Sequence, residues 1–347
     1  MTSKLYVKYF IGIVVIFVLF HFLSWRLVTK NIFGNDESVY VGDLGRLSYS
    51  LDSLQPRKSE ETLSRKYKVF LDYSHADVIT IGDSFSRGDA GGKNANYQDF
   101  IATKYDLDVV NVSPSDAGYI ETVLKLNSSG ALDKLQPKAI ILESVERLVI
   151  TRFSKKINWD IKSKPGELLA TTTDKFIPHI PSASFINHNN YMTWVYRALY
   201  HYSDNAFVSK VYKAQLVQDF FSAKDKRTLL YIYEDLDSIK KSNMQSVYKV
   251  NENLNYLQSI LKDKNIQLYF LPAADKYNVY SKYIIDNKHD ESNLFELLRG
   301  MKKNYFIIDT KAILQKLTDR GLKDIYYSDD THWTSIASEE IIDNTNF

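Results

Sequence analysis

The sequence contains no cysteine and carries almost no net charge. Its 347 residues include 44 lysines and arginines against 42 aspartates and glutamates, which gives a formal net charge of +2 at pH 7. The absence of cysteine excludes disulfide bonds and thiolate metal sites. The sequence lacks the excess of basic residues that is typical of nucleic-acid-binding proteins, so we expect no nucleic-acid partner.

Two kinds of ligand site are also missing. The histidines beyond the N-terminal region show no metal-ligand spacing relative to one another, which argues against a zinc site. These histidines are His75, His179, His188, His201 and His289. The glycines at Gly88, Gly91 and Gly92 do not follow a phosphate-loop or dinucleotide-binding pattern. We therefore expect no bound metal and no cofactor.

One long hydrophobic run is present, and it lies near the N-terminus. Residues 9–25 carry no formal charge and stand between Lys8 and Arg26. A helix of this length is near the lower end of what spans a bilayer. Tyr9 and Trp25 stand where interfacial aromatic residues are expected. No cleavage site of small residues follows the run, so we expect an uncleaved membrane anchor over residues 1–30 rather than a signal peptide.

After the predicted anchor, the sequence divides into two further regions with different patterns of residues. Residues 31–72 are polar and irregular, which indicates a stalk with a helix near residues 59–70. Over residues 73–347 strand and helix signals alternate, which predicts a mostly parallel sheet covered by helices. The alternation breaks at residues 151–233. We expect an insertion there, which can be a lid, a binding loop or an elaboration of the packing.

The predicted fold class is therefore α/β, with one N-terminal transmembrane helix. Strands are predicted at residues 78–81, 107–112, 139–143, 266–271 and 305–308. Helices are predicted at residues 97–105, 117–126, 237–261, 294–302, 311–318 and 333–342.

Ser84 is the first candidate for chemistry. It follows Gly82 and Asp83 directly after the strand predicted at residues 78–81. A serine on such a turn presents its Oγ at the C-terminal edge of a sheet, where it can act as a nucleophile, and its own N–H can serve as an oxyanion donor. The alternative is a serine that caps a helix. The strand before it and the glycines after it favour the nucleophile.

His332 is the matching candidate near the other end of the chain. It follows Asp329 and Asp330 in a loop that leads into the last predicted helix. A carboxylate can accept Nδ1–H and leave Nε2 to take the serine proton. Spacing leaves open which aspartate reaches the ring, and either one can instead cap the helix. Ser84 and His332 are informative together, because with an aspartate they complete a Ser-His-Asp site if both ends of the globular region meet.

Polar residues follow two other predicted strands. Glu143 and Arg147 stand at the end of the central strand, and ligands of open α/β sheets bind beyond the carboxyl ends of strands. Arg147 can bind an acceptor carboxylate, or it can fix a loop through an ion pair with Glu143 or Glu146. Lys276 follows the next strand. It is a candidate substrate or structural contact, although its chemistry favours a solvated lysine.

These segments resemble the sequence blocks of the SGNH hydrolase superfamily. The Gly-Asp-Ser-Phe-Ser segment around Ser84 is similar to its first block, and the aspartates before His332 are similar to its last. The order Asp-Thr-His-Trp at residues 330–333 resembles the motif of the alginate O-acetylation proteins and their relatives in polysaccharide acetylation. Residues 143–147 and 272–280 resemble two further segments of that branch.

The resemblance covers about residues 75–345 and implies a three-layer α/β/α sandwich. By motif position, Ser84 would be the nucleophile, His332 the general base and Asp330 its orienting acid. The wider superfamily places the acid three residues before the histidine, which makes Asp329 the alternative. Further candidates for the oxyanion hole or for substrate contacts are Asp83, Gly118, Glu143, Arg147, Lys276 and Trp333.

The resemblance implies a membrane-anchored O-acetyltransferase that acts on an exported or cell-surface polysaccharide through an acetyl-serine intermediate. A membrane-bound acyltransferase would supply the acetyl groups, since acetyl-CoA is not available outside the cytoplasm. We expect a single-pass protein of the bacterial inner or cytoplasmic membrane, with its domain on the periplasmic or extracellular side. Two alternatives stay open: a carbohydrate acetylesterase of SGNH type, and a non-catalytic glycan-binding component of an export complex.

Overall fold

The computed structural model of the chain describes residues 3–33, 41–55, 63–69, 74–88, 96–164 and 184–345. Its helices are α1 Ser3–Ser24, α2 Lys30–Phe33, α3 Asp43–Ser48, α4 Ser84–Arg87, α5 Tyr97–Tyr105, α6 Tyr119–Ser128, α7 Ala131–Leu135, α8 Glu146–Phe153, α9 Asn189–Leu199, α10 Tyr233–Ile239, α11 Met244–Lys262, α12 Lys276–Tyr280, α13 Leu294–Gly300, α14 Thr310–Asp319 and α15 Ser335–Asp343. Its strands are β1 Lys68–Val69, β2 Val78–Ile81, β3 Val109–Val112, β4 Ala139–Val145, β5 Val211–Gln215, β6 Thr228–Ile232, β7 Gln267–Ala273 and β8 Phe306–Ile307.

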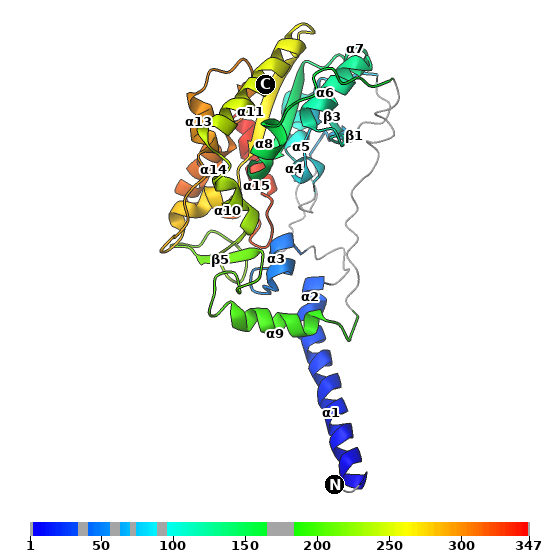
Figure 1. Cartoon of the computed structure of the whole chain (residues 1–347), viewed down its shortest axis with the longest axis vertical. Coiled ribbons are helices and arrows are strands. Elements are labelled where there is room, and N and C mark those ends of the chain that lie inside the picture. The colour runs from blue at the N-terminus through cyan, green and yellow to red at the C-terminus, as the bar shows by residue number, and fades with distance from the viewer. Residues whose placement is uncertain are drawn as a thin grey trace.

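Six of the described strands form one sheet, in the order β1-β3-β2-β4-β7-β8, and every neighbouring pair is parallel. The central strands β2 and β4 are buried along their whole length. Strands of a parallel sheet are apolar on both faces because helices cover both faces. Figure 1 shows this arrangement, with the sheet between two sets of helices.

The hydrophobic core accordingly has two halves, one on each face of the sheet. Successive strand residues point to opposite faces. Val78 belongs to the half that α5, α14 and α15 cover, whereas Ile79 belongs to the half that α6, α8 and α11 cover. The predicted α/β fold, with a mostly parallel sheet flanked by helices, is confirmed.

Several predicted boundaries differ from the structure. The helix predicted at residues 237–261 is two helices, α10 and α11, because Asn243 and Ser246 form a capping box that starts a new helix. Strand β7 continues through Pro272 to Ala273. The helix predicted near residues 59–70 is wrong in its described part, where residues 68 and 69 form strand β1.

The predicted insertion contains helix α9 and a pair of antiparallel strands, β5 and β6. Residues 165–183 of that segment lie outside the described residues. Strands β5 and β6 form a second sheet and do not join the main one, although Leu229 and Tyr231 of β6 pack into the same hydrophobic core as Leu271 of β7.

The N-terminal run, residues 3–33, is helical and is long and apolar enough to cross a membrane. A π-helical turn over Trp25–Thr29 joins α1 to α2. Most side chains of α1 are exposed, but His21 and Ser24 near its end are buried, as are Val28 in the π-helical turn and Ile32 in α2. Figure 1 shows α1 leaving the globular part at one end.

Residues 41–55 are part of the globular region, although the sequence indicates an irregular stalk there. Helix α3 packs against the loop that precedes His332. The N–H of Gly45 donates to the backbone carbonyl of Asp329 at 2.8 Å, and Leu44 is fully buried. Gly42 has no room for a side chain, because a Cβ atom there would lie 2.1 Å from the Asp329 carbonyl oxygen.

The first prediction concerns this close approach. Gly42 has a φ of −62°, which any residue can adopt, so the backbone conformation does not disfavour a substitution. The obstacle is the Asp329 carbonyl, with which a side chain would collide. We expect Gly42→Ala to lower the free energy of unfolding of the full chain in detergent by about 1–3 kcal/mol, the usual cost of overpacking. Gly300→Ala is the matched control, since nothing lies within 4 Å of a Cβ at that position. Equal stability of the two variants would contradict the packing of α3.

Candidate active site

Ser84 lies at the carboxyl edge of the sheet, in the turn between β2 and α4. Asp83 caps α4, and its Oδ1 accepts the N–H of Phe85 at 3.2 Å. The Oδ2 of Asp83 accepts the N–H of Val145 at 2.9 Å and pairs with Arg152. These bonds fix the turn to the end of β4. Asp83 therefore positions the serine.

Charge stabilises Asp83 in its ionised form. Burial alone would raise the pKa of Asp83, but the Arg152 guanidinium and the N–H groups of Val145 and Phe85 outweigh burial and lower it. Arg152 was not foreseen from the sequence. It stands two turns into α8, and nothing in its local pattern distinguishes it from a surface arginine.

Glu143 supports the same turn from the neighbouring strand. Its Oε2 accepts the N–H of Asp83 and the hydroxyl of Ser86, both at 2.8 Å. A Cβ at Gly82 would lie 2.2 Å from that oxygen, so only glycine lets the carboxyl group approach. Burial and the nearby Asp83 raise the pKa of Glu143 well above its usual value. Its place in the structure is that of a support for the turn, and it is not a residue that faces substrate.

His332 reaches Ser84 from the opposite end of the chain. Its Nε2 lies 2.7 Å from Ser84 Oγ, although 248 positions separate the two residues. Its Nδ1 lies 2.6 Å from Oδ1 of Asp330, and the same oxygen accepts the backbone N–H of His332 at 3.0 Å. The three side chains form one hydrogen-bonded line, which is the geometry of a serine nucleophile, its base and an orienting carboxylate.

The pKa of His332 is shifted in the direction that suits a general base. Burial lowers the pKa of the imidazole, but the charge of Asp330 and its hydrogen bond to Nδ1 outweigh burial. The pKa of His332 therefore lies above its usual value of 6.5. A base with this pKa binds the serine proton more strongly than a free imidazole would.

The structure shows which of the two aspartates contacts the imidazole, a question that the sequence could not decide. The Oδ2 of Asp329 accepts the N–H of Gly42 at 3.0 Å. Its backbone oxygen accepts from Gly45. Asp330 is the aspartate that contacts His332, whereas Asp329 joins the loop to α3.

Asp43 is a member of the site that the sequence did not suggest. Its two carboxylate oxygens accept the N–H and the hydroxyl of Thr331 at 2.9 Å and 2.7 Å. Burial and the neighbouring Asp330 raise its pKa. The residue lies in the segment interpreted as a stalk, where no motif marks it. Only the tertiary structure brings it to His332.

Asp43, Asp330 and His332 are the kind of group that can hold a metal ion, because their ligand atoms lie within 4.8 Å of one another. Each of these side chains also makes hydrogen bonds within the protein. Asp43 accepts from Thr331, and Asp330 pairs with the imidazole.

Lys276 is buried, so its interpretation as a solvated lysine is wrong. Its Nζ donates to the backbone oxygens of Tyr327, Ser328 and Asp330, at 2.7, 2.9 and 3.2 Å. Burial lowers its pKa to about 7, against the opposing charges of Asp329 and Asp330. Lys276 holds the loop that carries His332 and is a structural contact.

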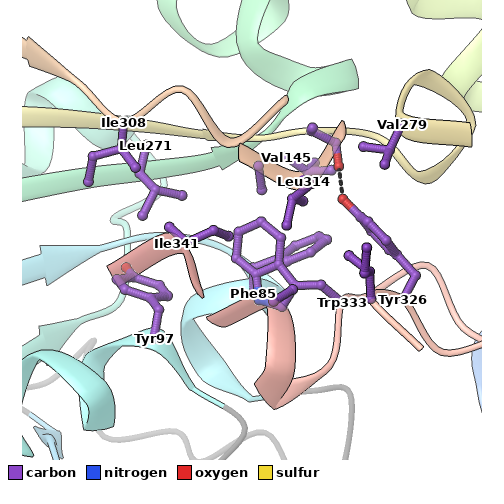
Figure 2. Close-up of a cluster of buried hydrophobic side chains, with 14 of the residues drawn as sticks. Phe85, Tyr97, Val145, Leu271, Val279, Ile308, Leu314, Tyr326, Trp333 and Ile341 are labelled. Atoms are coloured by element: carbon purple, nitrogen blue, oxygen red, sulfur yellow. Dashed lines mark hydrogen bonds between the residues drawn. The ribbon is translucent and has the colours of Figure 1, made fainter. Parts of the chain in front are cut away.

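Trp333 belongs to the core and not to a substrate surface. Its ring lies 4.7 Å from the ring of Phe85, edge to face, and only 3% of its surface is exposed. Figure 2 shows Phe85 and Trp333 together among buried side chains such as Val145, Leu314 and Ile341. The candidate role of Trp333 as a substrate contact is wrong, because the residue packs the histidine loop onto the serine turn.

Arg147 fixes a loop, but through partners other than those expected. It pairs with Asp275 at 2.7 Å and Asp235 at 3.3 Å, whereas the expected partners were Glu143 and Glu146. Both observed partners lie far along the chain, so spacing could not reveal them. Arg147 also lines the cavity beside Ser84.

Gly118 does not occupy the expected place of an oxyanion donor. Its N–H donates to the carbonyl of Ser115 at 2.9 Å and closes a turn before α6. Its φ of 130° favours glycine, and a Cβ there would lie 2.5 Å from Glu121 Oε2. Gly118 is a turn residue.

A cavity of about 320 Å³ opens beside Ser84. Its lining combines the serine turn with residues from two other segments, 114–119 and 145–152. The lining residues are Gly82, Asp83, Ser84, Arg87, Pro114, Tyr119, Val145, Arg147, Leu148 and Arg152. Arg152 lies over the ring of Tyr119 at 4.7 Å from its centre, so two of these side chains are fixed against each other. The space suits a small acyl group and part of an acceptor.

Comparison with known proteins adds no family assignment. No protein-family model matches the chain, and no curated protein matches it. The chemical interpretation of the site therefore depends on its geometry and on the resemblance of its motifs.

The second prediction uses Asp330 and Asp329 as a matched pair. A base accepts a proton only when it is neutral, so the rate at which a fluorophosphonate labels Ser84 is expected to rise with pH through a midpoint above 6.5. Asp330→Asn removes the charge that raises the pKa of His332. We expect a lower midpoint and a rate reduced by about 10⁴-fold, as for other orienting aspartates.

Asp329→Asn is the control, because its amide oxygen can still accept the N–H of Gly42. We expect this variant to keep both the midpoint and the rate of the parent chain. Equal losses in the two variants would reject Asp330 as the residue that orients His332.

Proposed function

We propose that the chain is a membrane-anchored O-acetyltransferase with an SGNH-like catalytic domain. It moves acetyl groups onto hydroxyls of an exported or cell-surface polysaccharide through an acetyl-Ser84 intermediate. One observation carries the proposal: Asp330, His332 and Ser84 form a continuous hydrogen-bonded line at the carboxyl edge of a parallel sheet. The resemblance of the motifs to the polysaccharide acetylation branch supplies the choice of reaction.

In the first half of the reaction, Ser84 Oγ attacks the acetyl carbonyl carbon while Nε2 of His332 takes its proton. Asp330 stabilises the imidazolium through Nδ1–H. The N–H of Ser84 is the first of α4 and so has no acceptor within the helix, which suits it to the developing oxyanion. The imidazolium returns the proton to the leaving group, and acetyl-Ser84 remains.

In the second half, His332 takes the proton of an acceptor hydroxyl, and that oxygen attacks the acetyl carbonyl carbon. The carbon–Oγ bond breaks, the serine oxygen recovers its proton from the imidazolium, and the acetylated sugar leaves. Hydrolysis differs only in that water attacks in place of the sugar. Transfer therefore depends on the acceptor, which must occupy the cavity beside Ser84.

The lining of the cavity is compatible with a neutral acetyl ester and a neutral hydroxyl. Asp83 is the carboxylate partner of Arg152, and Asp235 and Asp275 are the partners of Arg147. These two sets of ion pairs supply fixed polar groups beside Ser84, and Arg87 brings a third guanidinium to the lining.

The membrane anchor accords with a site of action at the cell envelope. The last turns of the apolar run are integrated into the domain, where His21 and Ser24 are buried by residues of α9. Cleavage of the run as a signal sequence would remove these contacts, so they favour a retained anchor. A single-pass anchor with the domain outside the cytoplasm needs a donor from the membrane. We propose a membrane-bound acyltransferase as that partner.

The third prediction tests the nucleophile. In Ser84→Ala the chain is expected to keep its fold, measured by circular dichroism, and to lose all labelling by a fluorophosphonate and all acetyl-enzyme formation. Ser86→Ala is the control from the same turn, because the Ser86 hydroxyl contacts Glu143 and Tyr97 and not His332. It should keep its labelling. A parent chain that binds polysaccharide but is not labelled would favour a non-catalytic binding component.

The fourth prediction concerns the product. With an acetyl ester donor and excess oligosaccharide, the full chain in detergent is expected to form acetylated sugar, detected by mass spectrometry, at the expense of free acetate. Ser84→Ala should form neither product above the uncatalysed level. Acetate without acetylated sugar would identify an esterase instead.

A further inference from the structure

Helix α9 of the insertion contacts the end of the apolar N-terminal run through specific polar bonds. The hydroxyl of Tyr191 lies 2.9 Å from Nε2 of His21, and the indole N–H of Trp194 donates to Ser24 Oγ at 2.8 Å. The fully buried Asn190 contacts Nδ1 of His21 at 2.8 Å. Figure 1 shows α9 lying across the end of α1 and not along it.

The apolar stripe of α9 faces outward. Tyr191, Trp194, Val195 and Ala198 are spaced i, i+3, i+4 and i+7, which places them on one face of the helix. All four are exposed, the first three at 43%, 42% and 45%. The helix thus buries a face that includes polar Asn190 and leaves its apolar stripe uncovered. This is the reverse of an ordinary surface helix.

The point at which α9 contacts the N-terminal run indicates how deep in the bilayer the apolar stripe would lie. The uncharged run over residues 9–25 is near the lower end of what spans a hydrocarbon core of about 30 Å, so the span ends close to Ser24 and Trp25. Helix α9 meets the run at His21 and Ser24, and the exposed Arg26 and Lys30 follow directly. The stripe therefore lies at the level where the hydrocarbon core gives way to headgroups.

The chemistry of the stripe and its surroundings matches that level. Tryptophan and tyrosine concentrate at the membrane–water interface. Here the polar atoms of Tyr191 and Trp194 are held by His21 and Ser24, while more than 40% of each residue's surface is exposed. Two exposed cations follow directly along the N-terminal run, Arg26 and Lys30, and they suit the phosphate groups of lipids. An amphipathic helix of this composition typically lies in the plane of the interface.

We propose that α9 is an interfacial helix whose stripe of Tyr191, Trp194, Val195 and Ala198 enters the headgroup region of the bilayer that α1 spans. The proposal rests on the membrane anchoring proposed above. It gives the insertion a role that the sequence left undecided between a lid, a binding loop and a packing elaboration. With two contacts to the membrane, the catalytic domain cannot rotate freely about its anchor.

The absence of cysteine makes a site-specific test straightforward, since a single introduced thiol is unique. The full chain is reconstituted in vesicles of phosphatidylcholine and phosphatidylglycerol, as Val195→Cys, Arg197→Cys or Val15→Cys labelled with bimane. Lipids that carry a nitroxide near the headgroup or deep in the acyl chain then quench the fluorescence. Val195 makes no side-chain hydrogen bond, and Arg197 is exposed on roughly the opposite side of the same helix.

We expect the headgroup-level nitroxide to remove most of the fluorescence at position 195 and little at position 197. The deep nitroxide should quench position 15 most strongly. Quenching at position 15 without quenching at position 195 would overturn the interfacial helix while leaving the anchor intact. This outcome includes a stripe covered by a protein partner or by another part of the chain. Absence of lipid quenching at both positions would reject the anchor itself.

Discussion

The contact between Phe85 and Trp333 is the interaction on which the candidate site depends. Each residue directly follows a member of the site, Ser84 or His332, and their rings lie 4.7 Å apart in the core. Joining segments separated by 248 positions costs on the order of 5 kcal/mol in loop entropy. One hydrogen bond contributes only about 0.5–1.5 kcal/mol. Apolar packing must therefore bring the two segments together, and the hydrogen bond then sets their geometry.

The parallel sheet explains why the packing succeeds. Strands β2, β4 and β7 are neighbours, so the segments that follow them emerge at one edge. Asp83 follows β2, Arg147 follows β4 and Lys276 follows β7. Each of these side chains contacts a different segment at that edge. The charged residues of the strand ends thus hold the loops of the site in place, and the serine and the histidine are left to meet in the space between them.

The sequence predicted those parts of the structure that depend on local pattern. The strand at residues 78–81 and the helix at residues 97–105 have the predicted bounds, because the periodicity of apolar residues determines them directly. Proximity of Ser84 and His332 was predicted from motif chemistry, and the structure brings them together. Their catalytic role is still a proposal.

Residues whose partners are distant in sequence could not be predicted. The sequence suggested Trp333 as a candidate substrate contact and Lys276 as a solvated lysine, because an aromatic ring or an amine near a motif carries no sign of burial. Each is buried by contacts across tens or hundreds of positions, with Phe85 for the tryptophan and with the carbonyl of Tyr327 for the lysine. Asp43 was missed for the same reason, since its relation to Thr331 exists only in the folded chain.

The loop that carries His332 has little regular structure of its own, so its shape depends on what binds its backbone. Lys276 holds it from the domain, with three carbonyl acceptors for the three N–H groups of an ammonium. Residues 41–55 hold it from another side, through Gly42, Asp43 and Gln55. The position of His332 therefore depends on two parts of the chain that are distant from it in sequence, and a change in either set of contacts would act on the histidine loop without passing through the sheet.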